Sequence, residues 1–216
     1  MEENKKKIVI ESIYSQLIDE EMVKAVGLLS EPLLREKAQI KAEERWQQLE
    51  RILTRGTECF LQKLESTENS SFIYQELRKL QIAVEQQKGL KIPDSIFDEG
   101  LQIGKKLLEY EHFEESEAIF QLMTILAPEV LDFWFGLGIS LEGMGKFDKA
   151  LSAFNQAFEA SDQKHPLPLL FCVECFRKQG LFQEARQELK KAKEVLSFDT
   201  RYASYQQQVT FLEESI

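Results

Sequence analysis

Apolar residues recur at steps of three and four along most of the chain, the spacing that places them on one face of an α-helix. In the N-terminal part, this pattern predicts helices at about residues 6–29, 33–65 and 72–88. Pro32 separates the first two, because proline cannot continue a preceding helix through its own position. No segment shows the alternation typical of a β-strand, so the sequence predicts an all-α protein.

A break in the pattern divides the chain into two parts. Gly89 and Pro93 lie close together after the third predicted helix, and these two residue types end helices and form linkers. We therefore expect an N-terminal helical region at residues 1–94 and a second domain at residues 95–216.

The second domain contains an internal repeat of 34 or 35 residues. Its clearest copy has Gly138, Gly145, Phe147, Ala150 and Phe154 at the offsets where tetratricopeptide repeats have small and aromatic residues. The copies one period away contain these residues: Gly104, Phe113, Ser116 and Phe120 before it, and Gly180, Phe182, Ala185 and Leu189 after it. Small residues let two helices approach closely, while the phenylalanines fill the space between neighbouring hairpins.

Three helical hairpins follow from this alignment, at about Phe97–Val130, Leu131–Lys164 and Pro166–Asp199. A single hairpin cannot bury its apolar face, whereas stacked hairpins share a continuous core. Tyr202, Val209 and Leu212 predict a last helix that covers the final hairpin. The expected fold is an all-α, right-handed superhelix of three tetratricopeptide hairpins with a C-terminal capping helix, preceded by an N-terminal helical region.

Charge narrows the class of partner. Residues 1–95 contain 15 basic and 17 acidic side chains, and residues 96–216 contain 12 and 20. An acidic surface repels phosphate groups, which disfavours nucleic acid and anionic membrane surfaces as partners.

No apolar stretch approaches the ~20 residues needed for stable membrane insertion. The chain's start lacks the apolar segment of a secretory signal, and three cysteines do not form a disulfide framework, so we expect a cytoplasmic protein.

Few residues are candidates for chemistry. Cys172 and Cys175 form a C-x-x-C pair near His165, but a zinc site would need further ligands, and packing is the better interpretation. Gly136 and Gly138 resemble part of a dinucleotide-binding motif that lacks its third glycine and its preceding strand. The sequence therefore predicts no enzyme, no cofactor and no metal site.

The inner surface of the repeats is the candidate binding site. In a hairpin superhelix the first helix of each hairpin lines the inner wall, and residues two, five, nine and twelve places into each hairpin should face it. These residues are Asp98, Leu101, Lys105 and Leu108 in the first hairpin, Asp132, Phe135, Ile139 and Glu142 in the second, and Leu167, Leu170, Glu174 and Arg177 in the third. Apolar residues with charged borders predict a groove for an extended apolar peptide.

Residues 96–197 resemble the class II translocator chaperones of bacterial type III secretion. The resemblance is carried by Phe113-Glu-Glu-Ser-Glu-Ala-Ile-Phe120, Phe135-Gly-Leu-Gly138, Met144-Gly-Lys-Phe-Asp-Lys-Ala150, Glu174-Cys175 and Lys178-Gln-Gly180. It implies a cytoplasmic holder that binds an extended, proline-containing segment of a hydrophobic translocator or effector in its groove. The groove positions implied by the resemblance are Leu101, Leu108, Phe113, Leu126, Leu137 and Phe154. The repeat spacing instead assigns Phe154 to packing, and the long N-terminal region offers a route to a homodimer.

Two other functions fit a tetratricopeptide fold. An adaptor that captures the C-terminal carboxylate of a partner needs Lys, Arg or Asn in the groove, where only Lys105 is suitable. The alternative is a structural subunit of a secretion assembly that docks through its N-terminal helices.

Overall fold

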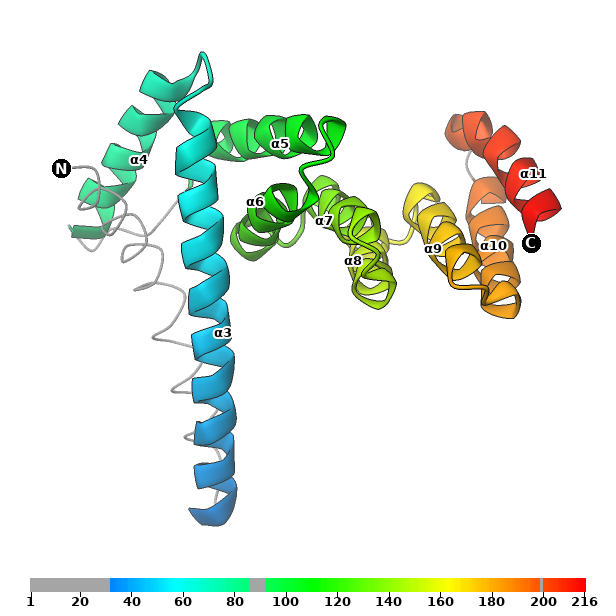
Figure 1. The fold of residues 1–216 in the computed structure, drawn as a ribbon, viewed down its shortest axis with the longest axis horizontal. Coiled ribbons are helices and arrows are strands. Elements are labelled where there is room, and N and C mark those ends of the chain that lie inside the picture. Colours follow the sequence, from blue (N-terminus) through cyan, green and yellow to red (C-terminus); the bar gives the residue numbers. More distant parts are fainter. Residues whose placement is uncertain (1–31, 86–91, 199) are drawn as a thin grey trace. The chain divides into compact units, whose positions relative to one another are not determined.

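A computed structural model describes residues 32–85, 92–198 and 200–216 (Figure 1). Within these ranges every regular element is a helix, which confirms the prediction of an all-α fold for this part of the chain. None of the helices there is both long enough and apolar enough to cross a bilayer. The helix predicted at residues 6–29 and the glycine of the predicted linker lie outside the described residues.

The chain divides into two compact units, Met1–Ile103 and Gly104–Ile216. The described part of the first unit contains α3 (Pro32–Leu64), α4 (Ser70–Glu85) and the beginning of α5 (Asp94–Glu109). The bounds of α3 and α4 agree with the helices predicted at residues 33–65 and 72–88. In the described part of this unit, the buried apolar side chains are Leu53, Phe60, Leu61, Leu64, Ile73, Leu77, Ile96 and Ile103.

The division falls inside α5, whereas the sequence places the boundary at residue 94. The side-chain amide of Asn69, in the turn between α3 and α4, donates a hydrogen bond of 3.0 Å to the Glu99 carboxylate on α5. The first half of α5 therefore packs with the N-terminal helices. An apolar stripe predicts that a helix is buried on one face, but it does not say which neighbour covers that face.

The second unit contains the repeats. After the last residues of α5 come α6 (Phe113–Leu126), α7 (Leu131–Gly143), α8 (Phe147–Ala160), α9 (Leu167–Lys178) and α10 (Phe182–Phe198). Each helix from α6 to α10 packs against the next one. The pairs α5–α6, α7–α8 and α9–α10 correspond to the three predicted hairpins, and this confirms the tetratricopeptide organisation.

The turns within the three hairpins have the same backbone structure. Their left-handed residues are Glu111, Gly145 and Gly180, with φ angles of 59°, 70° and 74°. Each turn is closed by the hydrogen bond of a Schellman cap, at 2.9 Å: His112 N–H to Leu107 O, Lys146 N–H to Leu141 O and Leu181 N–H to Phe176 O. Glycine suits such a position because it has no Cβ, which explains the glycines in two of the turns.

Glycines on the first helices admit aromatic rings from the second helices. The ring of Phe120 lies against the backbone of Gly104 and Gly136, and the ring of Phe154 lies against Gly138, so that a Cβ at any of these glycines would collide with a ring. Phe120 and Phe154 are fully buried. The spacing of small and aromatic residues thus sets the distance between the helices of the repeat domain.

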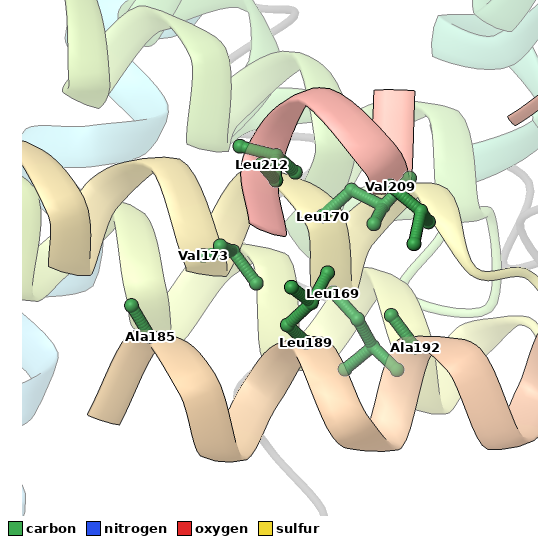
Figure 2. Packing of buried hydrophobic residues seen from close by; sticks show 8 residues of the cluster. All are labelled: Leu169, Leu170, Val173, Ala185, Leu189, Ala192, Val209 and Leu212. Carbon is green, nitrogen blue, oxygen red and sulfur yellow. The ribbon is translucent and has the colours of Figure 1, made fainter. Parts of the chain in front are cut away.

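The last hairpin is covered by a short 3-10 helix, η1 (Thr200–Tyr205), and by α11 (Gln206–Ser215). Figure 2 shows Val209 and Leu212 of α11 lying over apolar side chains of α9 and α10. The cluster consists of Leu169, Leu170, Val173, Ala185, Leu189, Ala192, Val209 and Leu212. Both α11 residues are fully buried, which confirms the predicted capping helix.

Candidate functional site

Three phenylalanines from three consecutive helices form an aromatic cluster. Phe135 of α7 and Phe171 of α9 meet edge to face with ring centroids 4.9 Å apart. Phe154 of α8 lies 5.6 Å from Phe135 and 5.3 Å from Phe171. Phe154 is fully buried, whereas the other two rings are half-buried. The cluster therefore has a closed base and two rings with accessible surface on the first helices of neighbouring hairpins.

The sequence of α7 explains this geometry. Phe135 is followed by Gly136 and Gly138, and these glycines let Phe120 of α6 and Phe154 of α8 lie against the helix backbone. The close approach of α8 brings the Phe154 ring under Phe135. Edge-to-face and tilted ring pairs of this kind are favoured over parallel stacking. The Phe-Gly-Leu-Gly segment thus positions the aromatic cluster as well as the helices.

Ion pairs lie on the same two helices. Lys178 Nζ of α9 donates to the Glu142 carboxylate of α7 at 2.8 Å. On α9, the Arg177 guanidinium donates two hydrogen bonds to one oxygen of Glu174, from Nε at 2.8 Å and from Nη2 at 2.6 Å. Of the carboxylates predicted for the wall positions of α7 and α9, Glu142 and Glu174 are therefore paired with cations. These two ion pairs balance charges on the two helices that carry Phe135 and Phe171, whereas Asp132, one turn before Phe135, is exposed.

Three predicted groove residues are instead core residues. Leu137, Phe154 and Leu170 are 6%, 0% and 0% exposed, so they have almost no surface to offer a ligand, and the prediction is corrected for them. Leu137 lies two residues from Phe135, a step that takes a helical side chain to a different face. Leu170 packs into the cluster of α9, α10 and α11.

The other predicted residues are distributed over several elements. Phe135 and Ile139 on α7 and Glu174 on α9 are half-buried, in keeping with a place on the wall. Phe113 and Leu126 are half-buried at the two ends of α6, which is a second helix, and Phe113 lies against Gly143. The predicted residues of α5 are Leu101, Lys105 and Leu108; Lys105 is exposed and the two leucines are half-buried. Leu101 belongs to the first compact unit, and its role in binding stays a prediction.

Phe171 was missed by the sequence alignment. A shift of 35 residues from Phe135 leads to Leu170, but the ring that meets Phe135 belongs to the next residue. The signal available in the sequence was the aromatic residue itself, one position beyond the aligned leucine. The aligned residue of the second hairpin is Gly136, which has no side chain, so the repeat pattern gives no sign that this position contributes to the wall.

The two cysteines on α9 are buried. Burial raises the pKa of the Cys175 thiol to about 12, and the carboxylate of Glu142 acts in the same direction. Burial also raises the pKa of the Cys172 thiol, with a further contribution from Glu188. Thiols that stay protonated are poor nucleophiles and poor metal ligands, so packing is the role these environments support. In the described ranges, no group of three or more His, Cys, Asp or Glu residues is arranged to hold a metal ion.

His165 lies at the junction of α8, α9 and η1. Its ring is 4.8 Å from that of Tyr202 and 6.0 Å from that of Tyr205, and its Nδ1 accepts a hydrogen bond of 3.3 Å from the Leu167 amide. Burial lowers the pKa of this imidazole, and the Asp132 carboxylate opposes the shift. These contacts give His165 a structural role in attaching the cap.

Comparison with known proteins agrees with this geometry. Residues 141–209, from the end of α7 into α11, match the tetratricopeptide repeat family. Low calcium response locus protein H of Yersinia pestis is 26% identical over 104 residues, which are 48% of this chain and 61% of that protein. The chain thus spans less than two thirds of the length of this relative.

Solved structures share the fold. The type III secretion translocator chaperone SycD of Yersinia enterocolitica has a TM-score of 0.55 at 21% identity, covering 62% of this chain and 97% of that one. SycD in complex with a peptide of the translocator YopD has a TM-score of 0.53 at 21% identity, covering 58% and 95%. The predicted resemblance to translocator chaperones is confirmed, and the shared fold is the all-α tetratricopeptide fold.

Proposed function

We propose that this chain is a type III secretion chaperone that binds an extended apolar segment of a translocator protein and keeps that protein soluble until it is secreted. The half-buried rings of Phe135 and Phe171 are the observation that carries the proposal. Two partly accessible aromatic rings over a buried base offer an apolar surface of the kind that anchors a partner's side chains. A solved relative with the same fold binds a translocator peptide, which supports the same class of partner here.

The proposed role is binding and involves no catalysis. It places the protein in the bacterial cytoplasm, where a translocator must be held before export. Neither a cofactor nor a metal takes part. A homodimer through the N-terminal helices remains a prediction.

The ion pairs favour this function over a carboxylate-capturing adaptor. Such an adaptor needs cations directed at the partner's C-terminus. Lys178 and Arg177 are engaged by Glu142 and Glu174, and freeing either cation would leave a carboxylate unpaired. An uncharged apolar segment can bind beside these pairs without disturbing them.

The first prediction tests whether the aromatic cluster binds the translocator segment. Phe135→Glu puts a charge where an apolar anchor should bind, so we expect the affinity for translocator peptides to fall about tenfold or more. Fluorescence anisotropy with overlapping labelled peptides from translocator proteins measures the affinity, and circular dichroism checks that helicity is native. Phe211→Glu is the matched control, because Phe211 is an exposed phenylalanine on the outer side of α11. Native helicity with unchanged affinity in Phe135→Glu would show that the groove assignment is wrong.

A further inference from the structure

A phenylalanine begins the second helix of every hairpin. These residues are Phe113 on α6, Phe147 on α8 and Phe182 on α10. The first two side chains are half-buried, but Phe182 is 45% exposed, and its neighbour Leu181 is 40% exposed. We call these two adjacent residues the Leu181–Phe182 ridge.

The first two hairpins show what normally covers this position. The ring of Phe113 lies so close to Gly143, the last residue of α7, that a Cβ there would collide with it. In the next hairpin, the Gln179 side-chain amide donates 3.2 Å to the Asp148 carboxylate, which places the end of α9 beside the start of α8. At both inner positions, the C-terminal end of the following first helix therefore lies beside the start of the second helix.

The capping helix does not cover the ridge in this way. Lys193 of α10 pairs with Glu213 of α11, and the Arg186 guanidinium contacts the Ile216 carbonyl. The end of α11 therefore meets α10 at Arg186, one helical turn beyond Phe182. The buried α11 residues Val209 and Leu212 pack farther along α10, with Leu189 and Ala192.

We propose that the Leu181–Phe182 ridge is a docking site for the last turn of an amphipathic helix from another protein, with glycine at the contact position. The site continues the interface that already joins the hairpins, where Gly143 fits against Phe113. The exposed Gln183 follows Phe182 as Asp148 follows Phe147, and it offers a side-chain amide at the rim. A larger residue in the partner's last turn would hold the two helices apart. The proposal is independent of peptide binding at the α7–α9 wall.

The helix that fits the equivalent position at Phe113 provides the probe. It is a synthetic peptide with the sequence of residues 131–146, which includes α7 and Gly143, stapled on the face away from Gly143 and labelled with fluorescein. Fluorescence anisotropy with the full chain should show saturable binding at concentrations up to about 1 mM. The Gly143→Leu version of the peptide should bind about tenfold more weakly or worse.

Protein variants identify the place of binding. Phe182→Asp and Leu181→Asp should each weaken binding of the probe about tenfold or more, because both put a charge into the apolar contact. Phe198→Asp is the matched control: Phe198 is 88% exposed at the other end of α10, and its variant should bind the probe like the wild type. The affinity for translocator peptides should stay unchanged in all three variants, which separates this test from that of the groove.

Several results would overturn the proposal. These are absence of saturable binding, equal binding of the Gly143→Leu probe, and unchanged binding when Leu181 and Phe182 are substituted singly in natively helical proteins. A further outcome is that the wild type dimerises in sedimentation experiments, that Phe182→Asp is monomeric, and that neither protein binds the probe. In that case a second copy covers the ridge and the proposal is wrong.

Discussion

Glycines in the repeat domain serve two separate physical purposes. Gly138 lies in α7 with the ring of Phe154 against its backbone, so its lack of a side chain provides space. Gly145 has a φ of 70° and no heavy atom near the place of a Cβ, so there the lack of a Cβ permits a left-handed backbone. The two roles predict different responses to the same substitution.

Gly138→Ala should lower the free energy of unfolding by about 1–3 kcal/mol, because the added methyl group overpacks the space filled by Phe154. Gly145→Ala should lower it by about 1–2 kcal/mol through backbone strain alone. Denaturation in urea measures both. The smaller side chain of Phe154→Leu should restore part of the stability lost in Gly138→Ala. In combination with Gly145→Ala, the effects of the two substitutions on the free energy of unfolding should add. Additive effects for both pairs would contradict the packing role of Gly138.

The protonation of His165 should make the free energy of unfolding depend on pH. Burial holds the pKa of its imidazole below the ordinary value of 6.5, so the unfolded chain takes up a proton first as the pH falls. The contribution of His165 is therefore complete above pH 6.5 and decreases as the pH falls through 6.5 toward the lowered pKa. The free energy of unfolding should fall more between about pH 7.5 and about pH 5.8 in the wild type than in His165→Gln. Equal decreases in the two proteins would show that His165 does not cause the dependence.

Much of the core could be predicted at the level of residues. The repeat spacing assigned Phe154 and Ala150 to packing, and both are fully buried. It missed Phe171 because the aligned residue of the second hairpin, 35 positions earlier, is Gly136, which has no side chain to mark this position as part of the wall. Both residues lie against the preceding second helix, Gly136 against Phe120 and Phe171 against Phe154, and only the packed helices show that the Phe171 ring also meets Phe135.

The capping helix has a buried face and an exposed face at adjacent residues. Leu212 is fully buried over α9 and α10, while the preceding residue, Phe211, is 61% exposed. Successive residues of a helix are rotated by about 100°, so adjacent positions on α11 face different surroundings. The stabilising effect of the cap can therefore be measured at neighbouring residues.

Leu212→Ala should lower the free energy of unfolding by about 2–5 kcal/mol, since it leaves a cavity against Leu170 and Val173. Phe211→Ala should change it by only about 0.5 kcal/mol, although it removes a larger side chain. Thermal and urea denaturation of both variants provide the comparison. A similar loss of stability in the two variants would contradict the assignment of α11 as a cap that packs through Val209 and Leu212.

The sequence predicts the bounds of the helices better than it predicts which helices pack against one another. Helical spacing, Pro32 and the turn glycines are local signals, and they gave the bounds of α3, α4 and the three hairpins closely. The assignment of the first half of α5 depends on contacts such as that between Asn69 and Glu99, thirty positions apart in the chain. No local pattern contains that information.

On the scale of the whole molecule, the account depends on an accessible wall formed by α7 and α9. The acidic excess of residues 96–216 disfavours nucleic acid, and Glu142 and Glu174 on the wall helices are paired with cations. What remains for recognition is apolar surface from Phe135, Ile139 and Phe171. A client should therefore lie along the first helices of the hairpins, away from the outer surface of the second helices.

Site-specific photo-crosslinking tests this claim most directly. The photoreactive residue p-benzoylphenylalanine would replace Ile139 on α7 in one protein and the exposed Gln156 on α8 in another, each mixed with the translocator peptide that binds best. The peptide should be captured at position 139 and left uncaptured at position 156. Capture at position 156 with none at position 139, in proteins of equal peptide affinity, would contradict this claim.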